Sequence, residues 1–170
     1  MPVARQQITP CLWFDRNAEE AVNFYITVFK NSKITHVVHY GQAGQEIHGG
    51  APDAVLAIDF ELDGQKFSCL NGGPHFKFSE AVSFQVPCET QEEIDYYWTT
   101  LTKGGSESDC GWLKDKFGLS WQVFPGRLLE MLRDPDRAKA DRAKADRAMS
   151  AMLTMKKIDV ATIDRAYAGK

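Results

Sequence analysis

Hydroxyl and amide side chains alternate with apolar ones in two β-prone segments of the chain. Ser83 and Gln85 lie in one segment, and Ser120 and Gln122 lie in the other. Because successive side chains of a strand point to opposite faces, the polar residues of each segment share one face. Such groups can recognise a small organic molecule by hydrogen bonding, or they can simply satisfy one another and water. The apolar neighbours should pack under helices; they are Val82, Phe84, Val86, Leu119, Trp121 and Val123.

More reactive chemistry has little support in the residue pattern. Neither Ser83 nor Ser120 is accompanied by a His and an acid at an evident spacing, so nucleophilic catalysis is not predicted. His36, His39 and His48 lie in or after a predicted strand, and they do not form a metal-binding motif by themselves.

The four cysteines are Cys11, Cys69, Cys88 and Cys110, and they form neither a CxxC pair nor a zinc-like spacing with histidine. Residues 1–7 lack the basic-then-apolar layout of a signal peptide. We therefore expect reduced thiols and a cytoplasmic protein. We expect Cys11 and Cys69 to lie in strands near the centre, where they could come close, and to be buried, inert thiols.

Composition limits the class of protein. The chain has 170 residues, 44% of them hydrophobic and 25% charged, as is typical of a soluble domain. A net charge of -3 does not favour nucleic acid as a partner. No apolar run approaches the roughly 18–20 residues that span a bilayer, so no membrane segment is predicted.

The first part of the chain has the pattern of a strand, a helix and three more strands. Asn17 is a predicted N-cap, followed by acidic residues that suit the first helical turn. Residues 41–52 are polar and glycine-rich and predict a loop, and Asp63-Gly64 predicts a hairpin turn. The helix is expected at 18–30 and the strands at 8–14, 34–40, 54–62 and 65–71.

The same pattern returns further along the chain. A strand at 82–86 is followed by Thr90, a second predicted N-cap, and by an amphipathic helix. Asn17 and Thr90 are 73 residues apart, and the two helices align at that offset without a gap. The turn glycines Gly64 and Gly118 each lead into a last strand, and residues 107–114 should supply the middle strands of the second unit. We infer a tandem duplication of one βαβββ unit.

A helical tail is predicted from residue 128 onward. Asp134-Pro135 resembles a helix start, and residues 137–147 use a five-residue unit twice. A five-residue step turns a helix by about 140°, so this stretch should be helical but solvated. Asp141 and Asp146 interrupt its basic residues, which does not favour a nucleic-acid-binding stripe.

The end of the tail is expected to dock on the rest of the protein. Residues 148–155 are more apolar than the repeat before them, and Asp159 is placed to cap a last short helix that reaches Tyr167.

Five separated blocks resemble the family often labelled 3-demethylubiquinone-9 3-methyltransferase-like. This family is a branch of the vicinal oxygen chelate superfamily, which also holds glyoxalase I, extradiol dioxygenases and bleomycin- and fosfomycin-resistance proteins. The blocks are ITPCLWFD at 8–15, LNGGPHFKF at 70–78, EAVSFQV at 80–86, CGWLKD at 110–115 and GLSWQV at 118–123. The doubled Ala-Lys-Ala-Asp-Arg of the tail looks like one unit more than is usual in the family.

The resemblance implies an α+β fold in which two tandem βαβββ units form a curved mixed sheet around a cavity. Residues 1–127 would be the glyoxalase-like domain, with units at about 6–75 and 79–126, and residues 128–170 a C-terminal helical extension. It also implies a homodimer. The methyltransferase name is less well supported, because a nucleotide-binding fold needs a glycine-rich turn after its first strand, and residues 15–19 contain no glycine.

Metal-dependent members of the superfamily take four ligands from the first and last strands of the two units. The resemblance places two such positions at Gln122 and Ser83, and the repeat then gives Ser68 and Pro10. These residues offer no carboxylate or imidazole, so a divalent metal is not expected and no cofactor is predicted.

The expected function is metal-independent binding of a small organic molecule in a polar cavity. Phe76 and Lys77 could cover a ligand or belong to an ordinary crossover, and Trp112 could be a cavity wall or core. The alternatives are a lyase, an isomerase or a dioxygenase-like enzyme of the superfamily, and a methyltransferase as the label suggests. The candidate ligand-binding residues are Ser68, Ser83, Gln85, Ser120, Gln122, Phe76 and Trp112.

Overall fold

The computed structural model describes residues 8–133 and 139–170, and the chain divides into two compact units after Lys77. The first unit is built from one four-stranded sheet in the order β1-β4-β3-β2. Strands β1 and β4 are parallel, and the other neighbours are antiparallel. The elements are β1 (Cys11–Phe14), α1 (Ala18–Val28), β2 (Lys33–His39), α2 (Gln45–His48), β3 (Val55–Leu62) and β4 (Gln65–Asn71). The predicted βαβββ order is confirmed, and the predicted loop at 41–52 contains the short helix α2.

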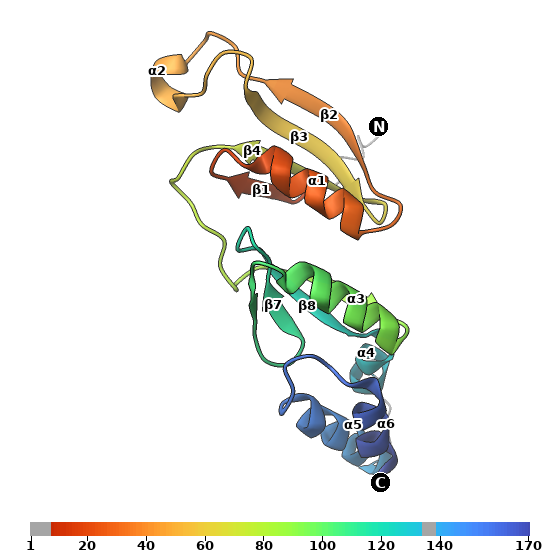
Figure 1. Ribbon diagram of the computed structural model, residues 1–170. Coiled ribbons are helices and arrows are strands. Elements are labelled where there is room, and N and C mark those ends of the chain that lie inside the picture. The colour runs from red at the N-terminus through yellow and green to blue at the C-terminus, as the bar shows by residue number, and fades with distance from the viewer. Residues whose placement is uncertain (1–7, 134–138) are drawn as a thin grey trace, which may run out of the picture. The chain divides into compact units, whose positions relative to one another are not determined.

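Helix α1 lies along one face of the first sheet (Figure 1). Its buried residues are Ala18, Ala21, Val22, Tyr25 and Val28. They meet the buried side chains Leu12, Phe14, Ile58, Phe60, Phe67 and Cys69 of the strands. Asn17 occupies the N-cap position but makes no side-chain cap bond; Ala18 N instead donates to Asn71 Oδ1 at 2.9 Å.

The second unit repeats this connectivity. Its sheet has the order β5-β8-β7-β6, with β5 and β8 parallel. The elements are β5 (Ser83–Cys88), α3 (Gln91–Thr102), β6 (Ser106–Glu107), β7 (Trp112–Lys114) and β8 (Ser120–Pro125). Thr90 caps α3 as predicted, because its side chain accepts a hydrogen bond from Glu93 N. The duplicated α+β fold is therefore confirmed.

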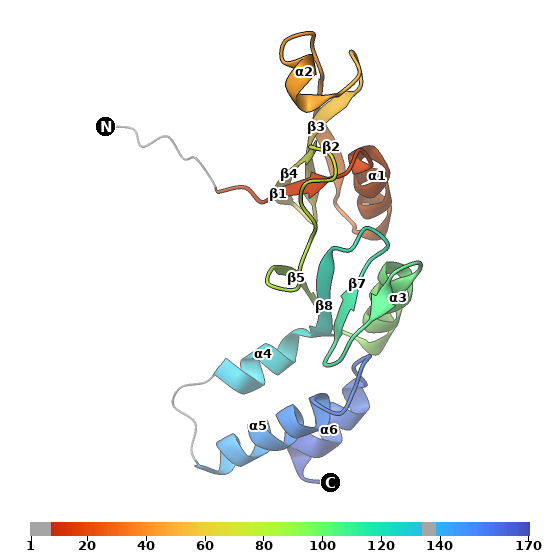
Figure 2. The ribbon, with the colours of Figure 1, turned by 90° about the vertical axis from the view of Figure 1, so that its left-hand side faces the viewer.

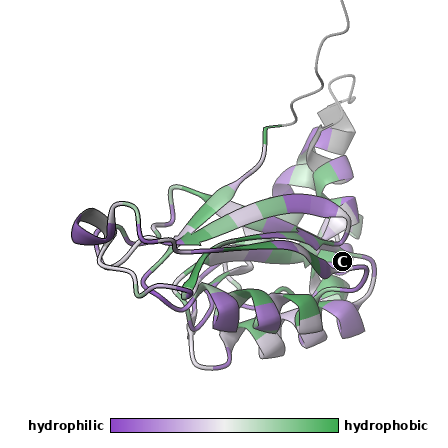
Figure 3. Cartoon of the chain, turned by 90° about the horizontal axis from the view of Figure 1, so that it is seen from above, coloured by the Kyte–Doolittle hydropathy of each residue, from purple (hydrophilic) through white to green (hydrophobic). Residues whose placement is uncertain are grey.

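Helix α3 covers one face of the second sheet, and we call the face of each sheet away from its helix the open face. Leu119, Trp121 and Val123 are buried on the helix side, as predicted. Val82 was predicted to join them, but this is wrong: it precedes β5 and is 65% exposed. Figure 3 shows hydrophilic and hydrophobic residues alternating along the helices, as expected of elements that bury one face.

In the described part of the chain, three helices follow β8 and belong to the second compact unit. They are α4 (Gly126–Arg133), α5 (Lys139–Met152) and α6 (Val160–Ala168), with α5 and α6 side by side (Figure 2). The helix start predicted at Asp134-Pro135 lies outside the described residues. Phe124, Leu128, Ala148, Ile158 and Ile163 form their buried core. The predicted boundary after residue 127 marks the end of the repeat, whereas the compact unit continues to Lys170.

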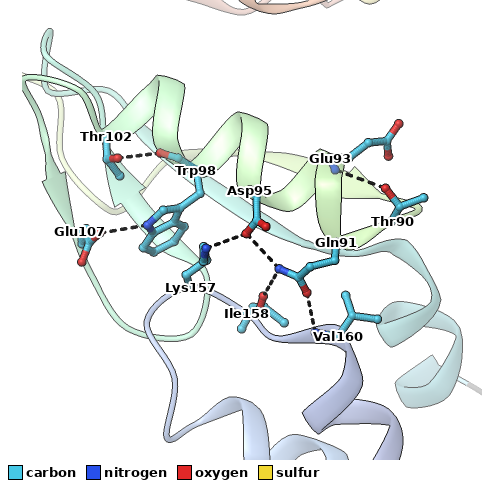
Figure 4. Close-up of polar contacts among 10 residues, drawn as sticks. All are labelled: Thr90, Gln91, Glu93, Asp95, Trp98, Thr102, Glu107, Lys157, Ile158 and Val160. Carbon is cyan, nitrogen blue, oxygen red and sulfur yellow. Dashed lines mark hydrogen bonds and ion pairs between the residues drawn. The ribbon is translucent and has the colours of Figure 1, made fainter.

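The tail is also bound to α3 by polar contacts (Figure 4). The Gln91 side chain donates to Ile158 O at 3.2 Å and accepts from Val160 N at 2.8 Å. Lys157 Nζ lies 2.6 Å from Asp95 Oδ1, and this hydrogen bond is the main reason that the pKa of Asp95 is lowered. Asp159 caps α6 by accepting from Thr162 N, as predicted. Within the described part of the chain, every helix is too short or too polar to span a bilayer.

Candidate functional site

The predicted polar residues of the second unit lie on its open face. Ser83 is the register partner of Ser120, and Gln85 is the partner of Gln122. Gln122 Nε2 donates a hydrogen bond to Ser83 Oγ at 2.8 Å. These four residues are brought together as the alternation predicted, although Gln85 is the most exposed of them.

Trp112 lies beside them on the third strand. It is the register partner of Gln122, and Lys114 is the partner of Ser120, so both side chains belong to the open face. Leu113, between them, is buried on the helix side. Of the two readings of Trp112 left open by the sequence, the structure therefore favours a wall of the open face over the helix-side core.

A pocket of about 190 Å³ is formed by this face and the chain around it. Its lining includes Glu80, Ser106, Glu107, Trp112, Lys114 and Ser120. Lys114 Nζ is 2.6 Å from Glu80 Oε1, and this bond lowers the pKa of the Glu80 carboxyl.

Ser120 is the most unusual residue of the pocket. It is only 1% exposed, and its Oγ has no hydrogen-bond partner among the described residues. A buried hydroxyl without a partner is unfavourable, and most such groups in proteins are satisfied by protein, water or ligand. Ser120 thus offers an unused hydrogen-bonding group at the pocket.

The first unit holds the candidates Ser68 and Phe76. Ser68 Oγ donates to Cys11 Sγ at 3.6 Å on the open face of the first sheet. Cys11 is exposed, so the expectation of a buried thiol is wrong for this residue. It is right for Cys69, which faces the helix and whose burial raises the pKa of its thiol to about 12.

Phe76 is 64% exposed and makes an edge-to-face contact with Trp13, with ring centroids 4.8 Å apart. Trp13 Nε1 donates to Gly73 O at 2.8 Å. A Cβ at Gly72 would lie 2.2 Å from the Trp13 ring, so only glycine fits there. The sequence did not lead us to predict Trp13 on the open face. The available signal was its position between Leu12 and Phe14, because alternate residues of a strand point to opposite faces.

The assignment of Pro10 as the counterpart of Ser83 is wrong. Cys11 pairs with Ser68 and Gln85 pairs with Gln122, which places corresponding residues of β1 and β5 74 rather than 73 positions apart. The buried pairs Leu12 and Val86, and Phe14 and Cys88, keep the same offset.

The difference arises between β1 and α1, where two residues separate strand from N-cap, whereas only Glu89 separates β5 from Thr90. Arg16, one of the two, has φ 63, a backbone conformation that an ungapped alignment of the helices cannot reveal.

The corrected strand positions remain poor metal ligands. Cys11, Ser68, Gln85 and Gln122 provide one thiol but neither a carboxylate nor an imidazole. Among the residues that the structure describes, no group of three or more His, Cys, Asp or Glu side chains is arranged to hold a metal ion.

Comparison with known proteins places the chain in a family. Residues 6–124 match the family described as 3-demethylubiquinone-9 3-methyltransferase, and the chain belongs to it. A search of curated proteins found no significant match to the chain.

Solved structures support the same assignment. The PhnB protein from Bacillus cereus, which bears the 3-demethylubiquinone-9 3-methyltransferase name, is 36% identical with a TM-score of 0.63 over 71% of this chain and 99% of its own. Protein PA1353 from Pseudomonas aeruginosa is 18% identical with a TM-score of 0.56 over 69% of this chain and 95% of its own.

The fosfomycin resistance protein FosX from Listeria monocytogenes is 14% identical with a TM-score of 0.52 over 78% of this chain and 100% of its own. These two more distant likenesses concern the fold alone. The family match and the PhnB likeness support the membership in the vicinal oxygen chelate superfamily that the sequence predicted.

Proposed function

We propose that the protein binds a small organic molecule on the open face of its second sheet, without a metal ion. The observation that carries this proposal is Ser120, a buried hydroxyl without a protein partner that lines a pocket of about 190 Å³. Ser83, Gln122 and Trp112 add hydroxyl, amide and aromatic surface on the same face. A few convergent polar groups beside an aromatic side chain are typical of ligand sites.

The absence of carboxylates and imidazoles from the first and last strands supports a metal-independent site. Hydroxyl and amide side chains bind neutral and polar organic groups well, and they bind divalent cations weakly. We expect the candidates of the first unit, Ser68 and Phe76, to contribute less, because Ser68 is already bonded to Cys11 and Phe76 rests on Trp13.

The methyltransferase name of the family is not the function that the fold favours. Each sheet has a single parallel pair, and the connection from β1 to α1 has no glycine-rich turn, so the nucleotide-binding crevice of a doubly wound sheet is not formed by these elements. A calorimetric titration with S-adenosylmethionine tests for a methyltransferase directly, and tight binding would support that function.

Thermal-shift screening of the full chain against a metabolite library, in buffer with EDTA, tests the proposal. A true ligand should raise Tm, because a ligand at 100 times its Kd stabilises the folded state by about 2.7 kcal/mol. The rise should be smaller for Ser120→Ala and unchanged for Ser150→Ala, an exposed serine of α5.

Two results would contradict the proposal. One is a broad library that yields no stabilising compound. The other is a ligand that binds only after a divalent metal is restored, together with stoichiometric metal in the purified protein. That second result would instead support a metal-dependent lyase, isomerase or dioxygenase. We also propose a homodimer, which light scattering on the purified chain would test.

A further inference from the structure

The hydrogen-bonding groups of the pocket are unevenly used. Ser120 Oγ has no partner within the described part of the chain, and the half-buried Trp112 lies on the same face. Lys114 has three N–H donors, of which Glu80 takes one. Ser120 and Lys114 can therefore donate hydrogen bonds to a ligand.

The carboxylates of the lining are placed differently. Glu107 pairs with Leu113, so its side chain leaves the sheet on the helix side, where Oε1 accepts from Trp98 Nε1 at 3.0 Å (Figure 4). Glu80 accepts from Lys114 at 2.6 Å. The acceptor with which a ligand must compete for Lys114 is therefore Glu80.

Lys114 and Ser120 are register partners on adjacent strands, so their side chains leave the sheet side by side. Glu80 is different, because it precedes β5 and its side chain is 67% exposed. Exposed ion pairs contribute little to stability, so another carboxylate can take the place of Glu80 on Lys114 at small cost.

We infer that the ligand of this pocket carries a carboxylate that binds Lys114 and Ser120 and displaces Glu80. This inference rests on the proposed function, because it names the chemistry recognised at the same site. With Glu80 displaced, the charge that remains on the open face of the lining is the Lys114 ammonium, because Glu107 lies on the helix side. One ammonium can pair with a single negative charge and leaves the second charge of a dianion unpaired. The half-buried Trp112 provides an apolar surface beside the donors.

Three probes of matched size test the inference on the full chain: benzoate, benzyl alcohol and benzylamine. Their Kd values are measured by following the indole N–H signal of Trp112 in ¹H–¹⁵N NMR spectra. Benzoate should bind roughly tenfold more tightly than either of the others, since charge-assisted hydrogen bonds are the stronger ones.

Four variants test which residues bind benzoate. Lys114→Met and Ser120→Ala should each weaken benzoate roughly tenfold. Glu80→Gln should strengthen it several-fold, because it removes the competing carboxylate. Lys33→Met, which breaks the Lys33–Glu61 ion pair of the first unit, should change nothing. Ser120→Ala removes a hydroxyl that has no partner, so it should fold normally, and its Tm checks this.

Benzylamine as the best ligand, or weaker benzoate binding in Glu80→Gln, would overturn the inference. A library ligand without a carboxylate that binds in a Ser120-dependent way would also overturn it, while the proposed function would stand. If neither the three probes nor the library bind, both the inference and the proposed function fail.

Discussion

Gln122 Nε2 donates to Ser83 Oγ at 2.8 Å, and this bond joins the last strand of the second unit to its first. The first unit has a related contact between its own last and first strands, from Ser68 Oγ to Cys11 Sγ at 3.6 Å. Metal-dependent members of the superfamily use these strands for metal ligands. In this chain, these two contacts join polar side chains of the same strands to each other.

The Gln122–Ser83 bond should contribute measurably to stability. Gln122→Ala is expected to lower the free energy of unfolding by about 1 kcal/mol, the net value of one hydrogen bond. Urea denaturation measures this change. Gln85→Ala is the matched control, because Gln85 is exposed and should cost less than about 0.5 kcal/mol. Equal losses in the two variants would contradict the role of the bond.

Asp115 should matter far more than its place in a loop suggests. It is 2% exposed, and its carboxylate accepts from Phe117 N, Leu119 N and Trp121 Nε1 at 2.8, 3.1 and 2.8 Å. Asp115→Ala leaves these buried donors without an acceptor, so we expect a loss of about 3 kcal/mol in chemical denaturation. The exposed Asp109→Ala is the control, and a similar loss there would refute the explanation.

Alanine substitutions at two glycines of the second unit distinguish the cost of backbone strain from the cost of a steric clash. Gly111 and Gly118 have φ values of 81 and 84, so alanine is strained at both. A Cβ at Gly111 would lie 2.5 Å from Val123 O, whereas nothing lies within 4 Å of one at Gly118. Gly118→Ala should cost about 1–2 kcal/mol. Gly111→Ala should cost clearly more, or prevent folding, and a smaller cost than Gly118→Ala in thermal denaturation would contradict the packing described.

The docking of the tail should depend on Gln91 more than on Lys157. Gln91 makes two hydrogen bonds to the backbone at Ile158 and Val160, whereas Lys157 makes an exposed ion pair with Asp95. Gln91→Ala should destabilise by about 1–2 kcal/mol and Lys157→Ala by less than about 1 kcal/mol. Hydrogen exchange of the α6 amides would report the loosening, and a larger effect of Lys157→Ala would reverse the assignment.

The sequence predicted the fold well because the two units repeat strong local signals. The helices begin where Asn17 and Thr90 placed them, and the strands of both units pair in the same order. The failures have local causes. Arg16 adds one residue before α1, which an ungapped comparison of helices cannot detect, and this error misplaced Pro10.

The site was harder to predict than the fold. Alternation placed Ser83, Gln85, Ser120 and Gln122 on one face, because the period of a strand is fixed. It could not place Glu80, which bonds to Lys114 from outside any strand. It also could not show that Ser120 is buried without a partner, since that depends on tertiary packing.

The buried thiols should make the protein sensitive to alkaline pH. Burial raises the pKa of Cys69 and Cys88 from 9.0 to about 12. A thiol whose pKa is higher in the folded state favours folding below the unfolded pKa, and this contribution is lost as the pH rises from about 9 to about 12.

The free energy of unfolding in urea should therefore fall less steeply over that range in a Cys69→Ala/Cys88→Ala variant than in the wild type. Iodoacetamide at pH 8 should modify the exposed Cys11 well before the two buried thiols. Equal slopes in the double variant and the wild type would show that these two thiols are not the groups responsible.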